Sequence, residues 1–417
     1  MRVLFTTFAA RSHLNALVPL AWALQTAGHQ VCVASQPDLA DHITGAGLTA
    51  VPVGPPLLLD ERVAEADDAN GDQAPAETDP EKLTWDYLHG VFSAMTPYVY
   101  EPFNGPEMID DLVAFARFWQ PDLVIWDPLT FAGPVVARVC AAAHARLLFG
   151  LDLQGLMRDA FVDLLGQRPA ASRDDPLRAW LESTLRRHGA TFDETVVVGQ
   201  ASIDVTPTSL RLPVDLPYIP VRYVPYNGPA VVPGWLREQP ARSRVCLTLG
   251  VSHREVQGGD RVSIGDILDA VADLDIEVVA TLDAEQLASL DRVPDNVRAV
   301  DFVPLNALLP TCSAIISHGG SGSFHTALTH GVPQVIVPAA MWDERIKARR
   351  LQDAGAGICV EKLTAVAVRE HLLQVLEDPS YAHNAAALRT EMVGTPGPND
   401  IVPALERLVA EHTDARA

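Results

Sequence analysis

The fold is decided by residues 3–53, which read VLFTTFAARSHLNALVPLAWALQTAGHQVCVASQPDLADHITGAGLTAVPV. Three short apolar runs alternate there with two helical stretches, in the order 3–8, 14–27, 31–34, 38–46 and 50–53. Each helical stretch is followed by a glycine, which commonly ends a helix. Buried strands that alternate with helices are typical of a parallel sheet covered by helices on both faces. The order therefore predicts the start of a doubly wound α/β domain.

The remainder of the chain continues this alternation in two series. Further strands are expected at residues 121–127, 145–149, 244–250, 277–282, 297–302, 314–317, 334–337 and 357–360. A proline-rich stretch with little periodicity, residues 205–243, separates the two series and predicts a domain boundary. We therefore expect an N-terminal domain (1–215), a linker (216–243), a C-terminal domain (244–395) and a closing helix (396–417), with a ligand cleft between the domains.

Composition and charge exclude several classes of function. The net charge of −22 argues against nucleic acid or an anionic membrane as the main partner, because both require clustered Lys and Arg. No apolar run approaches the 18 residues that a membrane-spanning helix needs. The five cysteines are scattered and no two have CxxC spacing, which is typical of reduced thiols in a cytoplasmic protein. A cytoplasmic enzyme or binding protein remains.

A first candidate site follows the first strand. In a doubly wound sheet the ligand crevice lies beyond the carboxyl ends of the strands. We expect His13 in the loop after strand 3–8, and Asp127 at the end of another strand of the same sheet. A carboxylate that accepts a hydrogen bond from one ring nitrogen makes the other nitrogen a better base. Two alternatives stay open: an exposed His13 in a loop that Ser12 caps, and an Asp127 that only caps a helix.

A second candidate site is the segment SHGGSGS, residues 317–323, between an expected strand and a helix. Glycines let the backbone approach an anion closely, serine hydroxyls donate hydrogen bonds, and the N–H groups at a helix start carry partial positive charge. This pattern predicts a phosphate-binding loop in which His318 donates to a phosphate oxygen. It is not the dinucleotide fingerprint GxGxxG, because His325 stands where the last glycine belongs. A tight strand-to-helix turn is the alternative, and His325 is expected to be structural.

Further candidates lie at strand ends of the second series. Thr248, Gly250 and Ser252 end its first strand, where they form either a contact to phosphate or sugar, or an ordinary turn. Asp343 and Glu344 follow the strand at 334–337, and carboxylates accept hydrogen bonds from sugar hydroxyls strongly. The alternative is that Asp343 caps the next helix.

We expect no metal and no cofactor. Asp273 and Asp275 come nearest to a metal-binding pair of carboxylates, which is what Mg²⁺ prefers. They stand at a helix-to-strand connection, which lies at the opposite edge of the sheet from the cleft.

These segments resemble the GT-B glycosyltransferases of family 1 from actinobacterial antibiotic pathways. Within that family the chain is most similar to macrolide and anthracycline deoxysugar transferases, such as the erythromycin-type desosaminyltransferases. The resemblance runs nearly end to end, and its most specific segments are residues 12–23, 45–54, 121–127, 226–229, 245–250, 294–298 and 318–323. It implies two Rossmann-like doubly wound domains that face a central cleft.

The resemblance also implies a reaction: inverting transfer of a deoxysugar from a dTDP-sugar to a hydroxyl of an apolar polyketide aglycone. His13 then matches the general base and Asp127 its supporting acid. Phe302 and Val303 match the segment that lines the nucleotide base. The donor diphosphate is matched by the loop residues His318, Gly319, Gly320, Ser321, Gly322 and Ser323. The pair Asp343 and Glu344 matches the donor-sugar contact, although many relatives carry Asp-Gln there.

The partners implied by the resemblance include a helper protein that looks like a cytochrome P450. Residues 83–119 are similar to the region that receives such a helper, although an ordinary packed helical pair has the same pattern. The large aromatic residues of this segment include Trp85, Tyr87, Phe92, Tyr98, Phe103 and Trp119. A homodimer is a further expectation. Two rival functions remain from the residues alone: a GT-B nucleotide-sugar epimerase, which needs no acceptor pocket, and a non-catalytic nucleotide-sugar-binding protein.

Overall fold

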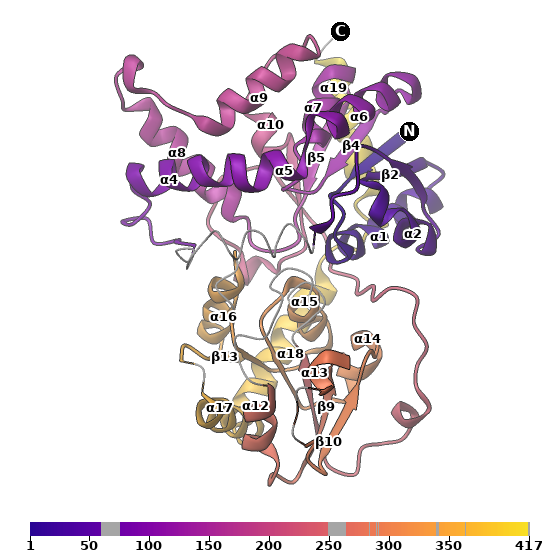
Figure 1. Ribbon diagram of the computed structural model, residues 1–417, viewed down its shortest axis with the longest axis vertical. Coiled ribbons are helices and arrows are strands. Elements are labelled where there is room, and N and C mark those ends of the chain that lie inside the picture. The colour runs from indigo at the N-terminus through magenta and orange to yellow at the C-terminus, as the bar shows by residue number, and fades with distance from the viewer. Residues whose placement is uncertain are drawn as a thin grey trace.

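The computed structural model describes residues 1–59, 76–248, 264–282, 284–288, 290, 292–338, 342–362 and 364–415. Within them the chain forms two parallel β-sheets with helices on both faces, one sheet above the other in Figure 1. Both sheets confirm the expected doubly wound α/β class. No helix in this part of the chain is both long and apolar enough to cross a membrane.

The first sheet has seven parallel strands in the order β3-β2-β1-β4-β5-β6-β7. They are β1 (Arg2–Thr6), β2 (Gln30–Ser35), β3 (Thr49–Pro52), β4 (Leu123–Trp126), β5 (Ala143–Leu147), β6 (Ala201–Asp204) and β7 (Tyr218–Pro220). The chain builds outward from β1 to β3 and then returns, so that β4 pairs with β1 and Thr6 lies opposite Trp126. The loops after β1 and β4 therefore diverge at a switch point of the sheet, where ligands of such folds bind.

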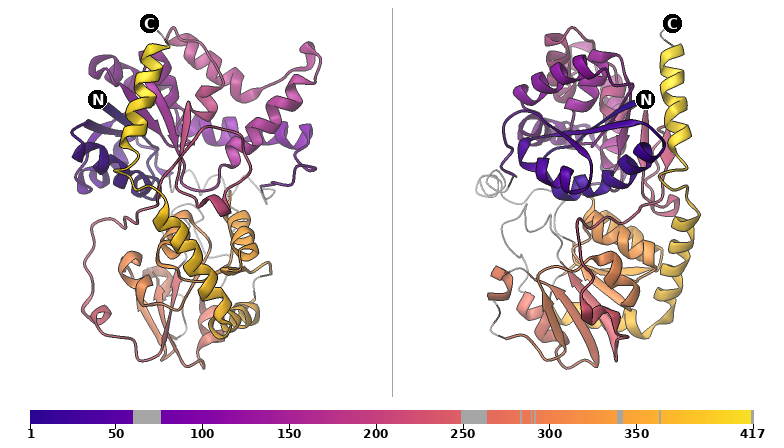
Figure 2. Two further views of the ribbon diagram at one scale, coloured as in Figure 1. Left: turned by 180° about the vertical axis from the view of Figure 1, so that it is seen from behind. Right: turned by 90° about the vertical axis from the view of Figure 1, so that its right-hand side faces the viewer.

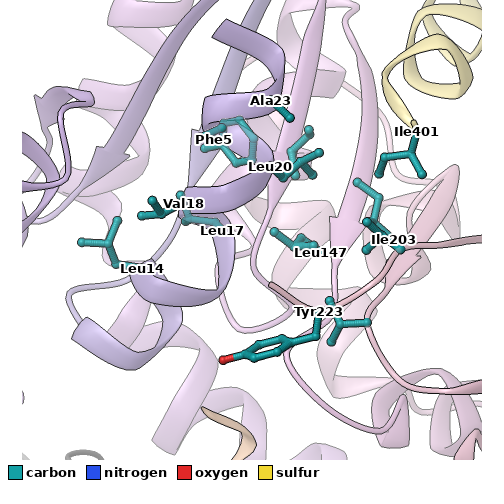
Figure 3. Packing of buried hydrophobic residues seen from close by; sticks show 14 of the residues in the cluster. Phe5, Leu14, Leu17, Val18, Leu20, Ala23, Leu147, Ile203, Tyr223 and Ile401 are labelled. Atoms are coloured by element: carbon teal, nitrogen blue, oxygen red, sulfur yellow. The ribbon is translucent and has the colours of Figure 1, made fainter. Parts of the chain in front are cut away.

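Helices cover both faces of the first sheet, and some of the helical segments of this domain pack on other helices instead. The segments are α1 (Arg11–Thr26), η1 (Pro37–Leu39), α2 (Ala40–Gly45), α4 (Trp85–Met95), η2 (Thr96–Tyr100), α5 (Glu101–Phe103), α6 (Pro106–Trp119), α7 (Ala132–Cys140), α8 (Leu153–Gly166), η3 (Ala170–Ser172), α9 (Pro176–Arg187), α10 (Thr195–Val198) and η4 (Thr208–Leu210). Those that pack on other helices include α4, α8 and α9. Leu14, Leu17 and Val18 of α1 belong to one buried cluster with Leu147 and Ile203 (Figure 3).

The second sheet repeats this arrangement with six parallel strands, in the order β10-β9-β8-β11-β12-β13. The strands are β8 (Ser243–Thr248), β9 (Ile276–Thr281), β10 (Val297–Val300), β11 (Ala314–Ser317), β12 (Gln334–Ile336) and β13 (Gly357–Cys359). The helical segments are η5 (Gly234–Arg237), α12 (Ile264–Val271), α13 (Ala284–Ala288), α14 (Leu305–Leu308), η6 (Leu309–Thr311), α15 (Ser321–His330), α16 (Glu344–Asp353), α17 (Ala365–Glu377) and α18 (Pro379–Gly394). Its switch point lies between β8 and β11, where Ser317 pairs with Thr248.

The chain ends on the first domain rather than on the second. Helix α19 (Val402–Asp414) follows α18 but lies along the upper half of the molecule (Figure 2). Ile401, Val402 and Leu405 are buried in the same cluster as Val3 of β1. Helix α19 therefore packs on the first domain and links the second half of the chain to it.

Two expectations from the sequence differ from the structure. Strand β7 lies inside the predicted linker, and it was missed because a three-residue strand shows no alternation; its Pro220 is tolerated at the edge of a sheet. Helix α1 begins at Arg11, so His13 stands in its first turn and not in a preceding loop. Ala10 occupies the N-cap position, and no side chain caps this helix, which excludes the capping role considered for Ser12.

A buried arginine holds together the helices on one side of the first domain. Arg158 of α8 bonds Asp175 at 2.7 Å and Glu194 at 2.8 Å, and its side chain is 1% exposed. Arg158→Met would leave the buried Asp175 without its partner, so we expect a loss of about 3–5 kcal/mol in the free energy of unfolding, measured by urea denaturation. Arg178→Met, in an exposed pair with Glu182, is the matched control and should cost less than about 1 kcal/mol. Equal losses for the two variants would contradict this account.

Candidate active site

A cleft of about 520 Å³ lies where the carboxyl edges of the two sheets face each other. The first domain contributes His13 and Phe149 to its lining, and the second contributes Thr248, His318 and Glu344. Candidate residues from both halves, which are far apart in sequence, thus line one shared space.

His13 and Asp127 form a hydrogen-bonded pair at the switch point of the first sheet. The distance from His13 Nδ1 to Asp127 Oδ2 is 2.5 Å, and the two side chains are 15% and 7% exposed. The pair forms because β1 and β4 are neighbours, so their carboxyl ends lie side by side. Nδ1 is the donor to the carboxylate, which leaves the lone pair of the neutral ring on Nε2. Asp127 Oδ1 also accepts a hydrogen bond from the Leu129 N–H at 2.9 Å. Asp127 therefore stabilises the turn after β4 and pairs with His13 at the same time.

Two phenylalanines fix the plane of the His13 ring. The ring centroids of Phe8 and Phe149 each lie 4.5 Å from that of His13. Sequence reasoning missed Phe149, which follows β5 and reaches His13 only because β5 is next to β4 in the sheet. The imidazole is therefore held on its sides by aromatic rings and at one nitrogen by a carboxylate.

Asp127→Asn is expected to lower kcat about 10–100-fold with little change in nucleotide affinity. An amide that donates toward Nδ1 favours the wrong tautomer and no longer stabilises the imidazolium, and general-base catalysis is worth about 10²–10⁴-fold in rate. The measurement is steady-state kinetics together with nucleotide titration. Asp122→Asn is a matched control, because Asp122 accepts from the Arg2 N–H at the other end of β4. An unchanged kcat in Asp127→Asn would contradict the pairing role.

The glycine-rich segment connects β11 to α15 and stands beside the end of β8. Gly319 has a φ of +89°, and a Cβ there would lie 2.8 Å from Ile336 Cγ2, so the turn requires glycine. Helix α15 begins at Ser321, and the first-turn N–H groups of a helix have no intrahelical acceptor. Gly320, Ser321, Gly322 and Ser323 all line the cleft. The geometry is that of an anion-binding loop, with Gly319 setting the direction of the chain.

Three further predicted residues are buried at this end of the cleft. His318 is 3% exposed, and its Nε2 lies 3.5 Å from Glu344 Oε1. The Thr281 hydroxyl lies 2.7 Å from the Thr248 hydroxyl. Thr248 also pairs with Ser317, the last residue before the loop. Gly250 and Ser252 lie outside the described residues.

His325 is a core residue of α15. It is fully buried, its Nδ1 lies 2.8 Å from the Ser321 carbonyl oxygen, and its ring stacks on Tyr223 at 5.1 Å. Burial lowers the pKa of His325 to about 3, so the ring stays neutral at physiological pH. Its role is structural, as expected from the sequence.

Asp343 joins the two halves of the molecule. It occupies the N-cap position of α16, but its side chain makes no capping hydrogen bond, which excludes the cap considered from the sequence. Oδ2 accepts from the Leu151 N–H of the first domain at 2.9 Å, and Oδ1 lies 2.9 Å from Lys347 Nζ. Sequence reasoning missed Lys347, although its spacing of four residues from Asp343 in a helical stretch was a signal.

Phe302 and Val303 lie between β10 and α14 and line the other end of the cleft. Phe302 is 50% exposed, whereas Val303 is buried. An exposed aromatic ring beside a buried aliphatic residue provides a flat apolar surface, as the expected contact to a nucleotide base requires.

The aromatic residues of segment 83–119 mostly pack inward. Trp85 stacks on Phe161, Phe103 on Phe8, and Trp119 on Phe115, while Phe92 is buried. Tyr87 packs at the edge of the same core. Tyr98 and Phe118 are the exceptions, being 70% and 83% exposed. The packed helical pair therefore explains most of these rings, and Tyr98 and Phe118 are left as surface features.

The carboxylates considered for a metal are engaged in ion pairs. Asp273 bonds Arg369, and Asp275 lies 3.0 Å from Arg242. Among the described residues, no three His, Cys, Asp or Glu side chains are grouped so that they could hold a metal ion.

Comparison with known proteins places the chain in a family. Residues 22–250 match the N-terminal domain, and residues 265–408 the C-terminal domain, of the proteins described as erythromycin biosynthesis protein CIII-like. The chain belongs to this family. The relatives that it matches over nearly their whole length are named as sugar transferases, so the chain is a glycosyltransferase, and this confirms the function class that the resemblance implied.

The transferase is similar over its whole length to proteins of known activity. It is 60% identical to aclacinomycin-T 2-deoxy-L-fucose transferase of Streptomyces galilaeus, over 99% of this chain and 97% of that protein. It is 54% identical to 10-deoxymethynolide desosaminyltransferase of Streptomyces venezuelae, over 99% and 98% of the two chains.

Solved structures confirm the GT-B architecture of the transferase. The crystal structure of glycosyltransferase VinC in complex with dTDP superimposes with a TM-score of 0.90 at 47% identity, over 99% of this chain and 100% of VinC. The spinosyn forosaminyltransferase SpnP gives a TM-score of 0.82 at 44% identity, over 98% and 99% of the two chains.

Proposed function

We propose that this transferase moves a deoxysugar from a dTDP-sugar to a hydroxyl group of an apolar polyketide aglycone of the macrolide or anthracycline type, with inversion at the anomeric carbon. One observation carries the proposal: His13, whose ring is hydrogen-bonded to Asp127, and the start of α15 line the same cleft. A base and an anion-binding loop are the two groups that such a displacement needs. The dTDP bound to VinC and the substrates named for the relatives support the choice of donor and acceptor.

His13 acts as the general base in this mechanism. Its Nε2 takes the proton of the acceptor hydroxyl while that oxygen attacks the anomeric carbon of the donor sugar. The bond from this carbon to the diphosphate oxygen breaks, and dTDP leaves with the electron pair. A single displacement inverts the anomeric centre. Asp127 stabilises the imidazolium that forms, and Phe8 and Phe149 keep the ring aimed at the acceptor.

The donor is held by the second domain. The N–H groups at the start of α15 and the hydroxyls of Ser321 and Ser323 stabilise the charge that develops on the diphosphate. Since these groups supply positive potential, we expect no metal requirement. Glu344, which begins α16 and lines the cleft, is the carboxylate that we assign to the donor sugar together with Asp343.

Calorimetric titration with dTDP in the presence of EDTA tests the donor half of the proposal. UDP and NAD serve as comparators, and neither an acceptor nor a chosen sugar is needed. We expect metal-independent binding of dTDP that is tighter than binding of either comparator. Absence of dTDP binding, also after a P450-like helper protein has been added, would contradict the donor assignment.

The helper protein and the homodimer remain predictions. Addition of the helper in that titration tests whether the donor site depends on it, and Tyr98→Ala tests whether the exposed ring takes part in the contact. Analytical ultracentrifugation of the purified chain tests the dimer.

A further inference from the structure

Lys347 is a buried lysine beside the anion-binding loop, and no step of the proposed mechanism uses it. The chain has three lysines, of which Lys82 and Lys362 are exposed, whereas the side chain of Lys347 is 1% exposed. Lys347 also lines the cleft. Burying an ammonium group is costly unless it is paired and hydrogen-bonded, so the partners of this group indicate what it does.

The Lys347 ammonium lies between two side chains of the second domain. Nζ is 2.9 Å from Asp343 Oδ1 and 3.0 Å from Ser321 Oγ. It also lies 5.6 Å from the centre of the Phe324 ring, on the helix that Ser321 begins. The carboxylate balances the charge, and the aromatic face covers one side of the group. Nζ is thereby held against the hydroxyl of the first residue of α15.

The chemistry of this contact fixes the direction of the Ser321 hydroxyl. An ammonium has three donors and no acceptor, so Ser321 Oγ must accept the hydrogen bond from Lys347. A serine hydroxyl has one proton of its own, which is then directed away from Nζ. Without the ammonium, that proton would turn to the Asp343 carboxylate, a stronger acceptor than water. With the ammonium in place, the proton is available to an anion in the cleft.

We propose that Lys347 is a positioning residue, which sets the Ser321 hydroxyl as a hydrogen-bond donor to the donor diphosphate. This inference rests on the proposed function, since it requires a diphosphate at the start of α15. Asp343 holds the ammonium in place and at the same time accepts from the Leu151 N–H of the first domain. The orientation of the hydroxyl is therefore tied to the contact between the two halves.

A double-mutant cycle in nucleotide binding tests the inference. A hydrogen bond to a charged group is worth about tenfold or more in affinity, so Ser321→Ala and Lys347→Met should each weaken dTDP binding about tenfold. In the Ser321→Ala background, Lys347→Met should add less than about threefold, because the hydroxyl that it orients is absent. Lys347→Arg, which keeps the donors, should restore most of the affinity.

Thymidine is the second probe, because it lacks the diphosphate. Its affinity should change less than about twofold in every variant, which separates loss of positioning from disturbance of the whole site. Asp343→Asn/Lys347→Met leaves no unpaired buried carboxylate and is the variant to use if Lys347→Met fails to fold. It should still weaken dTDP binding, but less than about tenfold, because an amide oxygen accepts from the Ser321 hydroxyl less strongly than a carboxylate does. Lys82→Met, in an exposed ion pair with Glu77, is the matched control.

The outcomes are distinct. Losses that multiply to about 100-fold in the Ser321→Ala/Lys347→Met variant, or equal losses for dTDP and thymidine, would overturn the positioning role. Unchanged dTDP affinity in Lys347→Met would overturn it as well, while the proposed function stands. Failure of the wild-type chain to bind dTDP would overturn the proposed function and this inference with it.

Discussion

His13→Ala is expected to lower kcat by about 10²–10⁴-fold while the dissociation constant for dTDP stays within about twofold. In the proposed mechanism His13 of the first domain provides the base, whereas the groups assigned to the diphosphate all belong to the second domain. Removing the ring therefore removes proton transfer and leaves the donor site intact. The measurement combines kcat under saturating donor and acceptor with calorimetric titration of dTDP.

The control for this variant is His383→Ala, since His383 is exposed on α18. It should leave both kcat and dTDP affinity unchanged. Retained turnover in His13→Ala would contradict the assignment of His13 as the base. Loss of turnover together with loss of dTDP binding would instead indicate that the variant disturbs the whole cleft.

Gly150→Ala is expected to reduce kcat/KM by about 10²-fold without unfolding the protein. A Cβ at this position would lie 2.3 Å from Asp343 Oδ2 and 3.1 Å from Ser321 Oγ. The loop after β5 would have to move away from α16, which breaks the bond from the Leu151 N–H to Asp343. The proposed base and the proposed diphosphate loop belong to different domains, and a displacement of about 1 Å in such a site costs about 10²-fold in rate.

Two further variants test whether the collision with Asp343 causes the loss of kcat/KM in Gly150→Ala. Gly166→Ala, at the end of α8, adds the same methyl group where no atom lies within 4 Å, and should leave kcat/KM unchanged. Asp343→Ala removes the carboxylate that the new Cβ would meet, so Gly150→Ala should cost much less in that background. Full loss in both backgrounds would show that the collision with Asp343 is not the reason.

Much of the fold was predictable from local patterns. Apolar runs such as residues 31–34 and 314–317 mark strands because a strand buried on both faces needs apolar residues throughout. The helical stretch that begins α1 was placed three residues too late, because Arg11, Ser12 and His13 are polar and no capping side chain precedes them. Strand β6 escaped notice, and so did β7, for which proline-rich sequence masks a short edge strand.

The candidate site was predictable as a set of residue types at the ends of strands. His13, Asp127 and the loop 318–323 each follow an expected strand, and in parallel sheets all such ends lie at one edge. Local sequence therefore predicts which residues lie at the expected ligand crevice of each domain. It does not predict which of them contact each other.

Local sequence patterns are thus sufficient to predict the class of fold, the edge of each sheet where the ligand crevice is expected, and the types of group placed there. Tertiary structure alone decided the partners: β1 beside β4 brings His13 to Asp127 across 114 positions. It also decided that the Asp343 carboxylate accepts a hydrogen bond from the Leu151 N–H of the other domain and holds the Lys347 ammonium against the Ser321 hydroxyl. The physical reason is the distance along the chain over which each feature is set. Strand and helix patterns depend on residues that are close in sequence, whereas strand order and domain contacts depend on packing between segments that are far apart in sequence.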